Sequence, residues 1–258
     1  MNARFGVSRG KALTVAALAA IVASTISGSA SALVDGTPAR SEHWGVIARN
    51  TIGSPVADLR DGPYGSFGVT GSDARPPYGQ GSLGIEVAGP STPTATDAEK
   101  VDFGNEVDFY GDPVLGLTKL GFRVFQTGEN QSPGADNLPA IRFEIDPNVT
   151  SNPSNYASLV WVPAALTATN KWSPYIDATS TGRWFLTGAW GACDQSHPAC
   201  TFADVKNFLN DGGQAPTIYT VAVGKGRDHA WVGAVDGLRI NNYVYDFEAD
   251  GVKPRRVL

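Results

Sequence analysis

The chain alternates between apolar and polar residues with a period of two in several short stretches. In residues 140–145, Ile141, Phe143 and Ile145 share one face of an extended strand, because successive side chains of a strand point to opposite faces. Similar stretches, separated by turn residues, occupy 82–87, 121–127, 157–162, 217–223, 232–240 and 243–247. Short strands at this spacing predict an all-β fold, an antiparallel β-sandwich of the jelly-roll type.

One segment, residues 202–211, departs from this pattern and predicts a short helix. Thr201 can cap its start together with Asp204, and Gly212 follows its end. Its apolar residues fall at helical spacing and form one stripe: Phe202, Val205, Phe208 and Leu209. A single amphipathic helix of this length packs on a sheet without changing the fold class.

The N-terminal segment has the three parts of a bacterial export signal. Basic residues precede an apolar run at 12–23, and small residues at 30–32 suit a signal peptidase. The run is shorter than the ~20 residues that span a bilayer. We therefore expect a signal peptide at 1–32 and a mature, secreted protein that begins near Leu33, with no membrane span. The mature chain divides into an N-terminal lead and loop at 33–65 and a β-sandwich domain at 66–258.

Charge narrows the class of partner. The full chain has 20 basic and 25 acidic residues, and the signal contains three basic residues and no acidic one. The mature chain thus keeps 17 basic and 25 acidic residues, a net charge of −8. Nucleic acids and anionic lipids require basic surfaces, so this balance argues against both as partners.

Two cysteines, Cys193 and Cys200, enclose a short loop. Export makes a disulfide chemically permissible, and further metal ligands at a recognisable spacing are absent from the sequence. We expect the pair to form a disulfide that fixes this loop.

Aromatic residues between 161 and 190 suggest a binding surface. Sugars stack their apolar faces on such rings, and a few polar groups fix the sugar hydroxyls. The rings are Trp161, Trp172, Tyr175, Trp184 and Trp190, although any one of them can equally belong to the core. The residues expected to bind a ligand are Arg142, Glu144, Trp161, Trp172, Trp184, Arg227 and Asp228.

No residue is assigned a catalytic role. The chain has three histidines and lacks the Gly-x-Ser-x-Gly pattern of a nucleophile elbow. Glu144 and Asp146 lie two apart on one strand face, about 7 Å from each other, which is compatible with a glycosidase. Arg142 beside them on the same face would lower both pKa values, which favours a solvated charged face over an acid catalyst.

Acidic residues near the C-terminus make a structural calcium ion the one cofactor to consider. Secreted β-sandwiches often tie loops together with oxygen ligands. The candidate ligands are Asp236, Asp246 and Glu248, although their spacing matches no known calcium loop. The sequence indicates no other cofactor.

The order of several segments resembles that of a group of uncharacterised exported bacterial proteins with a jelly-roll, galactose-binding-like domain. The resemblance spans roughly 67–248 and rests on Gly81–Ile85, Leu115–Leu120, Ile141–Asp146 and the ending at 234–248. These motifs are structural, so the resemblance implies a fold and no catalytic residues.

Three functions follow as hypotheses. The leading one is a secreted, non-catalytic binding module for carbohydrate or a cell-surface polymer. The second is a polysaccharide-acting enzyme, a glycosidase or lyase, that uses Glu144, Asp146 or Asp228. The third is a structural protein of the extracellular matrix or surface.

Overall fold

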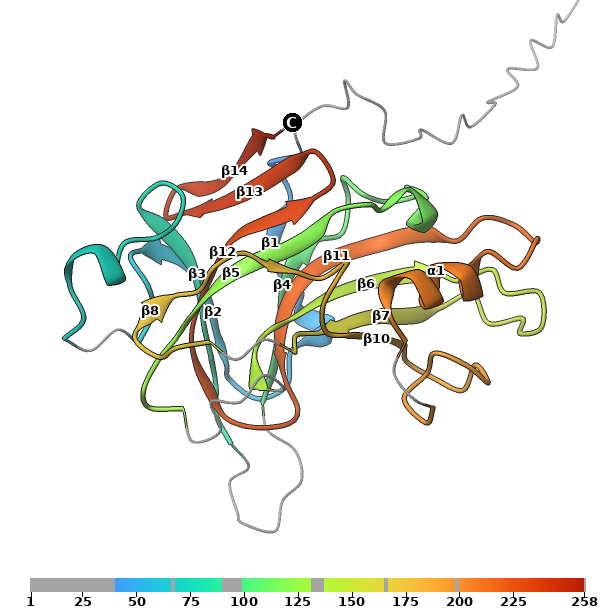
Figure 1. Cartoon of the computed structure of the whole chain (residues 1–258), viewed down its shortest axis with the longest axis horizontal. Helices are drawn as coiled ribbons and strands as arrows, with labels where there is room; N and C mark the ends of the chain where they lie inside the picture. The colour runs from blue at the N-terminus through green and yellow to red at the C-terminus, as the bar shows by residue number, and fades with distance from the viewer. Residues whose placement is uncertain are drawn as a thin grey trace, which may run out of the picture.

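The protein folds as a sandwich of two antiparallel β-sheets with one short α-helix (Figure 1). The structure is a computed structural model that describes residues 40–65, 68–89, 99–130, 137–164, 167–197 and 200–257. The predicted all-β sandwich is therefore confirmed. The predicted signal peptide at 1–32 lies outside the described residues.

The first sheet has six strands in the order β1-β4-β11-β6-β7-β10. All its neighbours pair antiparallel. Its strands are β1 (Trp44–Val46), β4 (Lys100–Asn105), β11 (Thr217–Gly226), β6 (Ala140–Asp146), β7 (Ala157–Val162) and β10 (Arg183–Leu186).

The second sheet is built around β12 (Trp231–Ile240), which pairs with β3, β5 and β13. The other members are β2 (Val56–Asp61), β3 (Gly81–Val87), β5 (Leu120–Gln126), β8 (Lys171–Trp172), β9 (Ile176–Asp177), β13 (Tyr243–Glu248) and β14 (Gly251–Arg256). β5 also pairs with the short strands β8 and β9. β13 pairs with the edge strand β14, and β3 pairs with the edge strand β2.

Apolar residues from the facing sides of both sheets fill the space between them. Ile141, Phe143 and Ile145 of β6 are each 0% exposed, which confirms the predicted buried face of this strand. Trp161 and Trp184 lie opposite each other on β7 and β10 and are also 0% exposed. Burial of large rings is the main favourable contribution to such a core.

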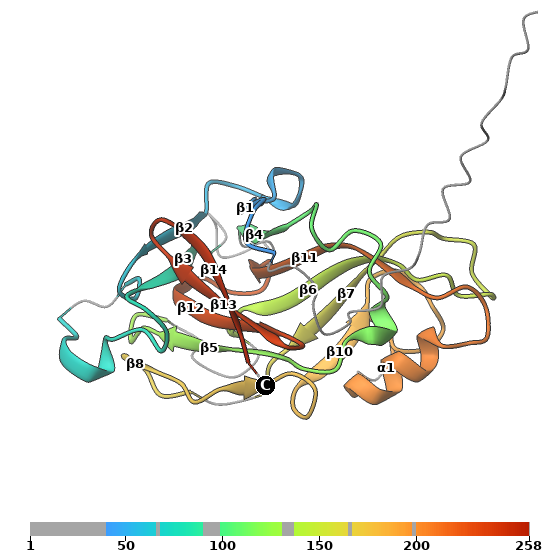
Figure 2. The same ribbon diagram turned by 90° about the horizontal axis from the view of Figure 1, so that it is seen from above.

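The helix α1 (Phe202–Leu209) covers one end of the sandwich beside β10, whereas β8 lies at the opposite end (Figure 2). Thr201 accepts from the backbone N–H of Asp204, and the Asp204 carboxylate accepts from the backbone N–H of Thr201. This reciprocal capping box satisfies N–H groups that a helix start leaves unpaired. The predicted helix is confirmed, and it ends two residues before the expected 211. The described residues also form three 3₁₀ turns: η1 (Ala48–Asn50), η2 (Gly71–Asp73) and η3 (Val114–Gly116).

β1 and β2 both lie in the segment 33–65, which the sequence analysis described as a lead and loop. β1 pairs with β4, and β2 pairs with β3. Gly and Pro residues on both sides of β2 obscure its strand pattern in the sequence. Among the described residues, none of the helices has the length and apolar character needed to cross a membrane.

Candidate functional site

The outer face of the six-stranded sheet carries most of the polar residues singled out in the sequence. β6 directs Arg142 and Glu144 to this face, because its alternate residues are buried in the core. The neighbouring positions on β11 are Ala222 and Thr220, whose small side chains leave the longer ones room. This face is the candidate site.

A depression of about 250 Å³ lies at one end of this face, where β11 turns toward β12. Arg142, Arg227 and Asp228 all line it, so the fold brings together three of the seven predicted ligand-binding residues. Arg183 and Phe185 of β10 line its opposite side. The sequence analysis missed both, although their position beside Trp184 in a period-two strand placed them on its outer face.

Charged groups beneath the depression are fixed in place. Arg142 forms an ion pair with Asp102 of β4 and donates to the carbonyl of Gly226 at 3.1 Å. Asp102 is 1% exposed and also pairs with Lys100 at 3.3 Å. A Cβ atom at Gly224 would lie 1.8 Å from the Asp102 carboxylate, so only glycine leaves space for this pair.

A second ion pair lies at the end of β11, beside the depression. Lys225 pairs with Asp228, three residues further on in the β11–β12 turn. Burial lowers the pKa of Lys225, and Asp228 opposes that effect. Although burial acts in the other direction, the Lys225 ammonium and the hydrogen bonds lower the pKa of Asp228, which favours its ionised form.

Glu144 lies on the same face but outside the depression. Its carboxylate pairs with Arg49 and accepts from Asn50 at 3.0 Å and from the Tyr156 hydroxyl at 2.8 Å. Burial acts to raise the pKa of Glu144, yet these hydrogen bonds outweigh it and lower the pKa. Glu144 is thus a structurally engaged carboxylate, and it does not meet the predicted partners Arg227 and Asp228.

The predicted tryptophans do not line this site. Trp161 and Trp184 lie in the core with no exposed ring face, so the expectation that they stack on a sugar is wrong. Trp172 is partly exposed, but it packs against Phe125 on the other sheet. The physical reason is that large rings bury more apolar area in the core than any other side chain can.

Tyrosines provide the exposed rings of this face instead. Tyr110 is 68% exposed and stacks on Tyr219 of β11, with ring centroids 5.7 Å apart. The Tyr219 hydroxyl donates to the carbonyl of Asn155 at 3.0 Å. Partial burial and the neighbouring Asp146 carboxylate of β6 raise the pKa of the Tyr219 hydroxyl. The sequence analysis did not single out either tyrosine.

The three expected calcium ligands meet near the loop at 78–80, where they bind protein donors. Asp236 accepts from the backbone N–H groups of Tyr78 and Gly237, and Glu248 accepts from that of Gln80. Asp246 pairs with Arg255 at 2.5 Å. Within the described ranges, no group of three or more His, Cys, Asp or Glu side chains is arranged to hold a metal ion. Calcium binding stays a prediction that this geometry does not favour.

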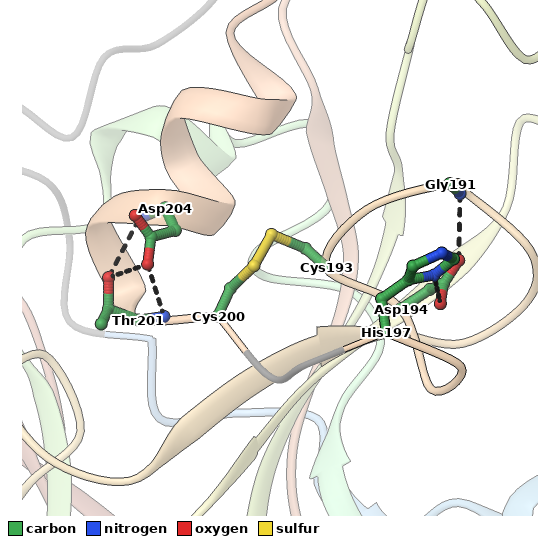
Figure 3. Close-up of a disulfide and its surroundings, with 7 residues drawn as sticks. All are labelled: Gly191, Cys193, Asp194, His197, Cys200, Thr201 and Asp204. Atoms are coloured by element: carbon green, nitrogen blue, oxygen red, sulfur yellow. Dashed lines mark hydrogen bonds and ion pairs between the residues drawn. A yellow bond between two sulfur atoms is a disulfide. The ribbon is translucent and has the colours of Figure 1, made fainter.

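The disulfide Cys193–Cys200 is present, as predicted, and lies just before α1 (Figure 3). Asp194 beside it accepts from the backbone of Trp190 and Gly191 and from the His197 ring at 2.7 Å. The His197 hydrogen bond and these backbone N–H groups lower the pKa of Asp194 strongly. Figure 3 shows the disulfide between the capping box of α1 and the hydrogen bonds of Asp194, so these residues have a structural role.

Comparisons with known protein families, with curated proteins and with solved structures find no match to this chain. The resemblance to exported jelly-roll proteins therefore stays a prediction. Function has to follow from the chemistry of the outer face, where exposed rings and fixed charges lie on one sheet.

Proposed function

We propose that this protein is a secreted, non-catalytic binding module for a carbohydrate or cell-surface polymer, which lies along the outer face of the six-stranded sheet. The stacked pair Tyr110–Tyr219 carries the proposal. Tyr110 presents most of its ring to solvent while Tyr219 supports it from below. Rings held in this way bind the apolar faces of sugars at little cost in side-chain entropy.

The distance along the face suits an extended polymer. Tyr219 and Lys225 are six positions apart on β11, which corresponds to about 20 Å of strand. The tyrosine pair thus lies at one end of the face and the depression with Phe185 at the other. A chain of several sugar units can contact both ends at once, which makes the overall binding tighter than binding at either end alone.

The carboxylates of this face favour binding over hydrolysis. A glycosidase needs a carboxylic acid with a raised pKa that can donate a proton to the leaving sugar oxygen. The surroundings of Glu144 and Asp228 lower both pKa values instead. The export pattern at 1–32 and the disulfide support an extracellular location for the module.

A glycan array tests the proposal with the purified protein and its Tyr110→Ala variant. Removal of one stacking ring should weaken the binding of the recognised glycans about three- to tenfold. Tyr243→Ala is the matched control, because Tyr243 belongs to a tyrosine pair on the other sheet. Thermal unfolding of each variant confirms that it is folded. The proposal fails if the wild-type protein binds no glycan, or if both variants bind as the wild type does.

A further inference from the structure

A separate pocket lies on the outer face of the second sheet, beside the turn that follows β2. Its volume of about 450 Å³ is within the range of about 300–1,000 Å³ that is usual for small-molecule sites. Arg60, Glu86 and Val232 line it from β2, β3 and β12, and Tyr64 lines it from the turn. The neighbouring Ile85 is 0% exposed in the core, so Glu86 points to the outside of the sandwich.

Three side chains of this pocket form a connected group. The Arg60 guanidinium lies over the Tyr64 ring, 4.7 Å from its centroid. The Tyr64 hydroxyl donates to the Glu86 carboxylate at 2.6 Å. This hydrogen bond, burial and the charge of Glu86 raise the pKa of Tyr64, so its hydroxyl keeps the proton that it donates. Tyr64 thus holds a cation at its ring face and an anion at its hydroxyl end.

Two glycines let this group lie close to the sheet. A Cβ atom at Gly84 of β3 would lie 2.8 Å from Cβ of Tyr64 and 3.0 Å from Cδ of Arg60. A Cβ atom at Gly65 would lie 2.5 Å from Cγ1 of Val232, so the turn also packs directly on β12. Side chains that are already ordered bind a ligand with less loss of entropy than mobile ones do.

The pocket offers both hydrogen-bond donors and acceptors. Among the described residues, the Arg60 guanidinium has no hydrogen-bond or ion-pair partner, and this includes its buried Nε. Its contact with Tyr64 uses the flat face of the group, whereas its N–H donors lie in the plane. Glu86 uses one lone pair for the Tyr64 hydroxyl and keeps others, because an ionised carboxylate has about four.

The charges in and near the pocket favour a neutral ligand. Arg60 and Glu86 line it as one cation and one anion. Asp58, two residues before Arg60 on β2, lies close enough to help raise the pKa of Tyr64. Two carboxylates against one guanidinium disfavour an anion such as a sugar acid. Arg60 already lies over the Tyr64 ring, where a cationic ligand would bind.

We infer that this pocket is a second carbohydrate site, which binds a neutral sugar unit between Arg60 and Glu86. One sugar hydroxyl accepts from the Arg60 guanidinium, and another donates to the Glu86 carboxylate. The apolar side chains of Pro63, Val69 and Val232 contact the C–H groups of the sugar ring.

This site goes beyond the proposed function, because it lies on the other sheet and does not involve the pair Tyr110–Tyr219. The outer faces of the two sheets point away from each other across the shared core. A module with one site on each face can join two polymer chains.

Changes in the amide NMR signals of the isotope-labelled protein test the site with matched sugars. The probes are the methyl glycosides of glucose, galactose and mannose, each beside the methyl glycoside of its uronic acid, in which a carboxylate replaces the CH₂OH group. At least one neutral glycoside should shift the signals of residues 60–65 and 84–86, and its uronic acid should bind about three- to tenfold more weakly. The inference is overturned if no neutral glycoside shifts these signals, or if the uronic acid binds as tightly.

Variants locate the site. Arg60→Met keeps the apolar stem and should weaken binding of the neutral glycoside about tenfold. Glu86→Gln should weaken it about three- to tenfold, because an amide accepts less strongly than a carboxylate. Arg75→Met is the matched control, since Arg75 is exposed and does not line the pocket. Thermal unfolding checks that each variant is folded. Wild-type affinity in folded Arg60→Met and Glu86→Gln also overturns the inference.

Tyr110→Ala separates this site from the proposed one. It should leave the sugar-induced shifts at 60–65 unchanged, whereas Arg60→Met should leave the Tyr110-dependent binding on the glycan array unchanged. Array binding that needs Tyr110, without any shift at the pocket, overturns the inference alone. Shifts at the pocket, without any effect of Tyr110→Ala on the array, overturn the proposed function alone.

Discussion

The ammonium of Lys225, whose side chain is 1% exposed, pairs with the carboxylate of Asp228, whose side chain is 43% exposed. A buried cation is therefore neutralised by a partner that reaches the surface. Asp228→Asn should destabilise the fold by about 1–3 kcal/mol, because Lys225 loses its counter-charge. Lys225→Met should cost less, since it removes the buried charge and keeps the apolar stem. Urea unfolding of both variants measures the difference, and a larger loss for Lys225→Met would contradict this account.

Asp236 should make stability depend on pH. Burial raises its pKa to about 7. The nearby Asp246 carboxylate also raises this pKa, whereas hydrogen bonds from three backbone N–H groups lower it. An Asp in the unfolded chain has a pKa of about 3.9. The folded state thus binds the proton more tightly, and the contribution of Asp236 is complete below about pH 4 and is lost as the pH rises through 7.

The expected loss between about pH 5 and pH 8 is about 2–3 kcal/mol in the free energy of unfolding. Asp236→Asn should reduce this difference between the two pH values. It should not abolish it, because burial raises the pKa of Asp246 as well. Asp250→Asn is the control, since the pKa of this carboxyl is lowered and it titrates below the pH window. An unchanged pH dependence in Asp236→Asn would contradict the assignment.

Gly224 should be essential for the floor of the depression. An alanine Cβ there would lie 1.8 Å from the Asp102 carboxylate and 2.7 Å from the Val101 carbonyl, a backbone atom that cannot move freely. Gly224→Ala should therefore destabilise the protein by about 1–3 kcal/mol and displace the partner of Arg142. Gly45→Ala is the matched control, because no atom lies within 4 Å of its added Cβ. Thermal unfolding and glycan titration of both variants check the prediction.

Loss of the disulfide should have a limited effect on stability. Cys193 and Cys200 are seven positions apart, and closure of so short a loop is worth about 2–2.5 kcal/mol in the chain-entropy account. Cys193→Ser combined with Cys200→Ser should lower stability by about that amount and leave binding at the outer face unchanged. Intact-mass measurement with and without reductant shows whether the bond forms, and an unchanged mass after reduction would contradict it.

The fold was largely readable from local pattern. The alternation in 140–145 predicts which residues of β6 are buried, because a strand has only two faces and the core takes the apolar one. Thr201 and Asp204 likewise predict the start of α1, since a capping box involves neighbours in sequence. β2 was missed because its six residues do not alternate strictly between apolar and polar, and because turn residues flank it.

The site was readable only in part. Arg142, Arg227 and Asp228 were singled out from sequence, and the fold brings them together. Trp161 and Trp184 were also singled out, yet both are buried. Composition indicates that rings are present, but it does not tell which side of a strand faces the partner sheet.

The sequence by itself thus determined most of the strands, the helix and the disulfide, because each depends on residues close together in the chain. Only the tertiary structure decided which charges meet. Arg183 and Arg227 are 44 positions apart, and they line one depression because β10, β7, β6 and β11 are neighbours in one sheet. Strand order depends on long-range packing, and with it the place where a ligand can bind.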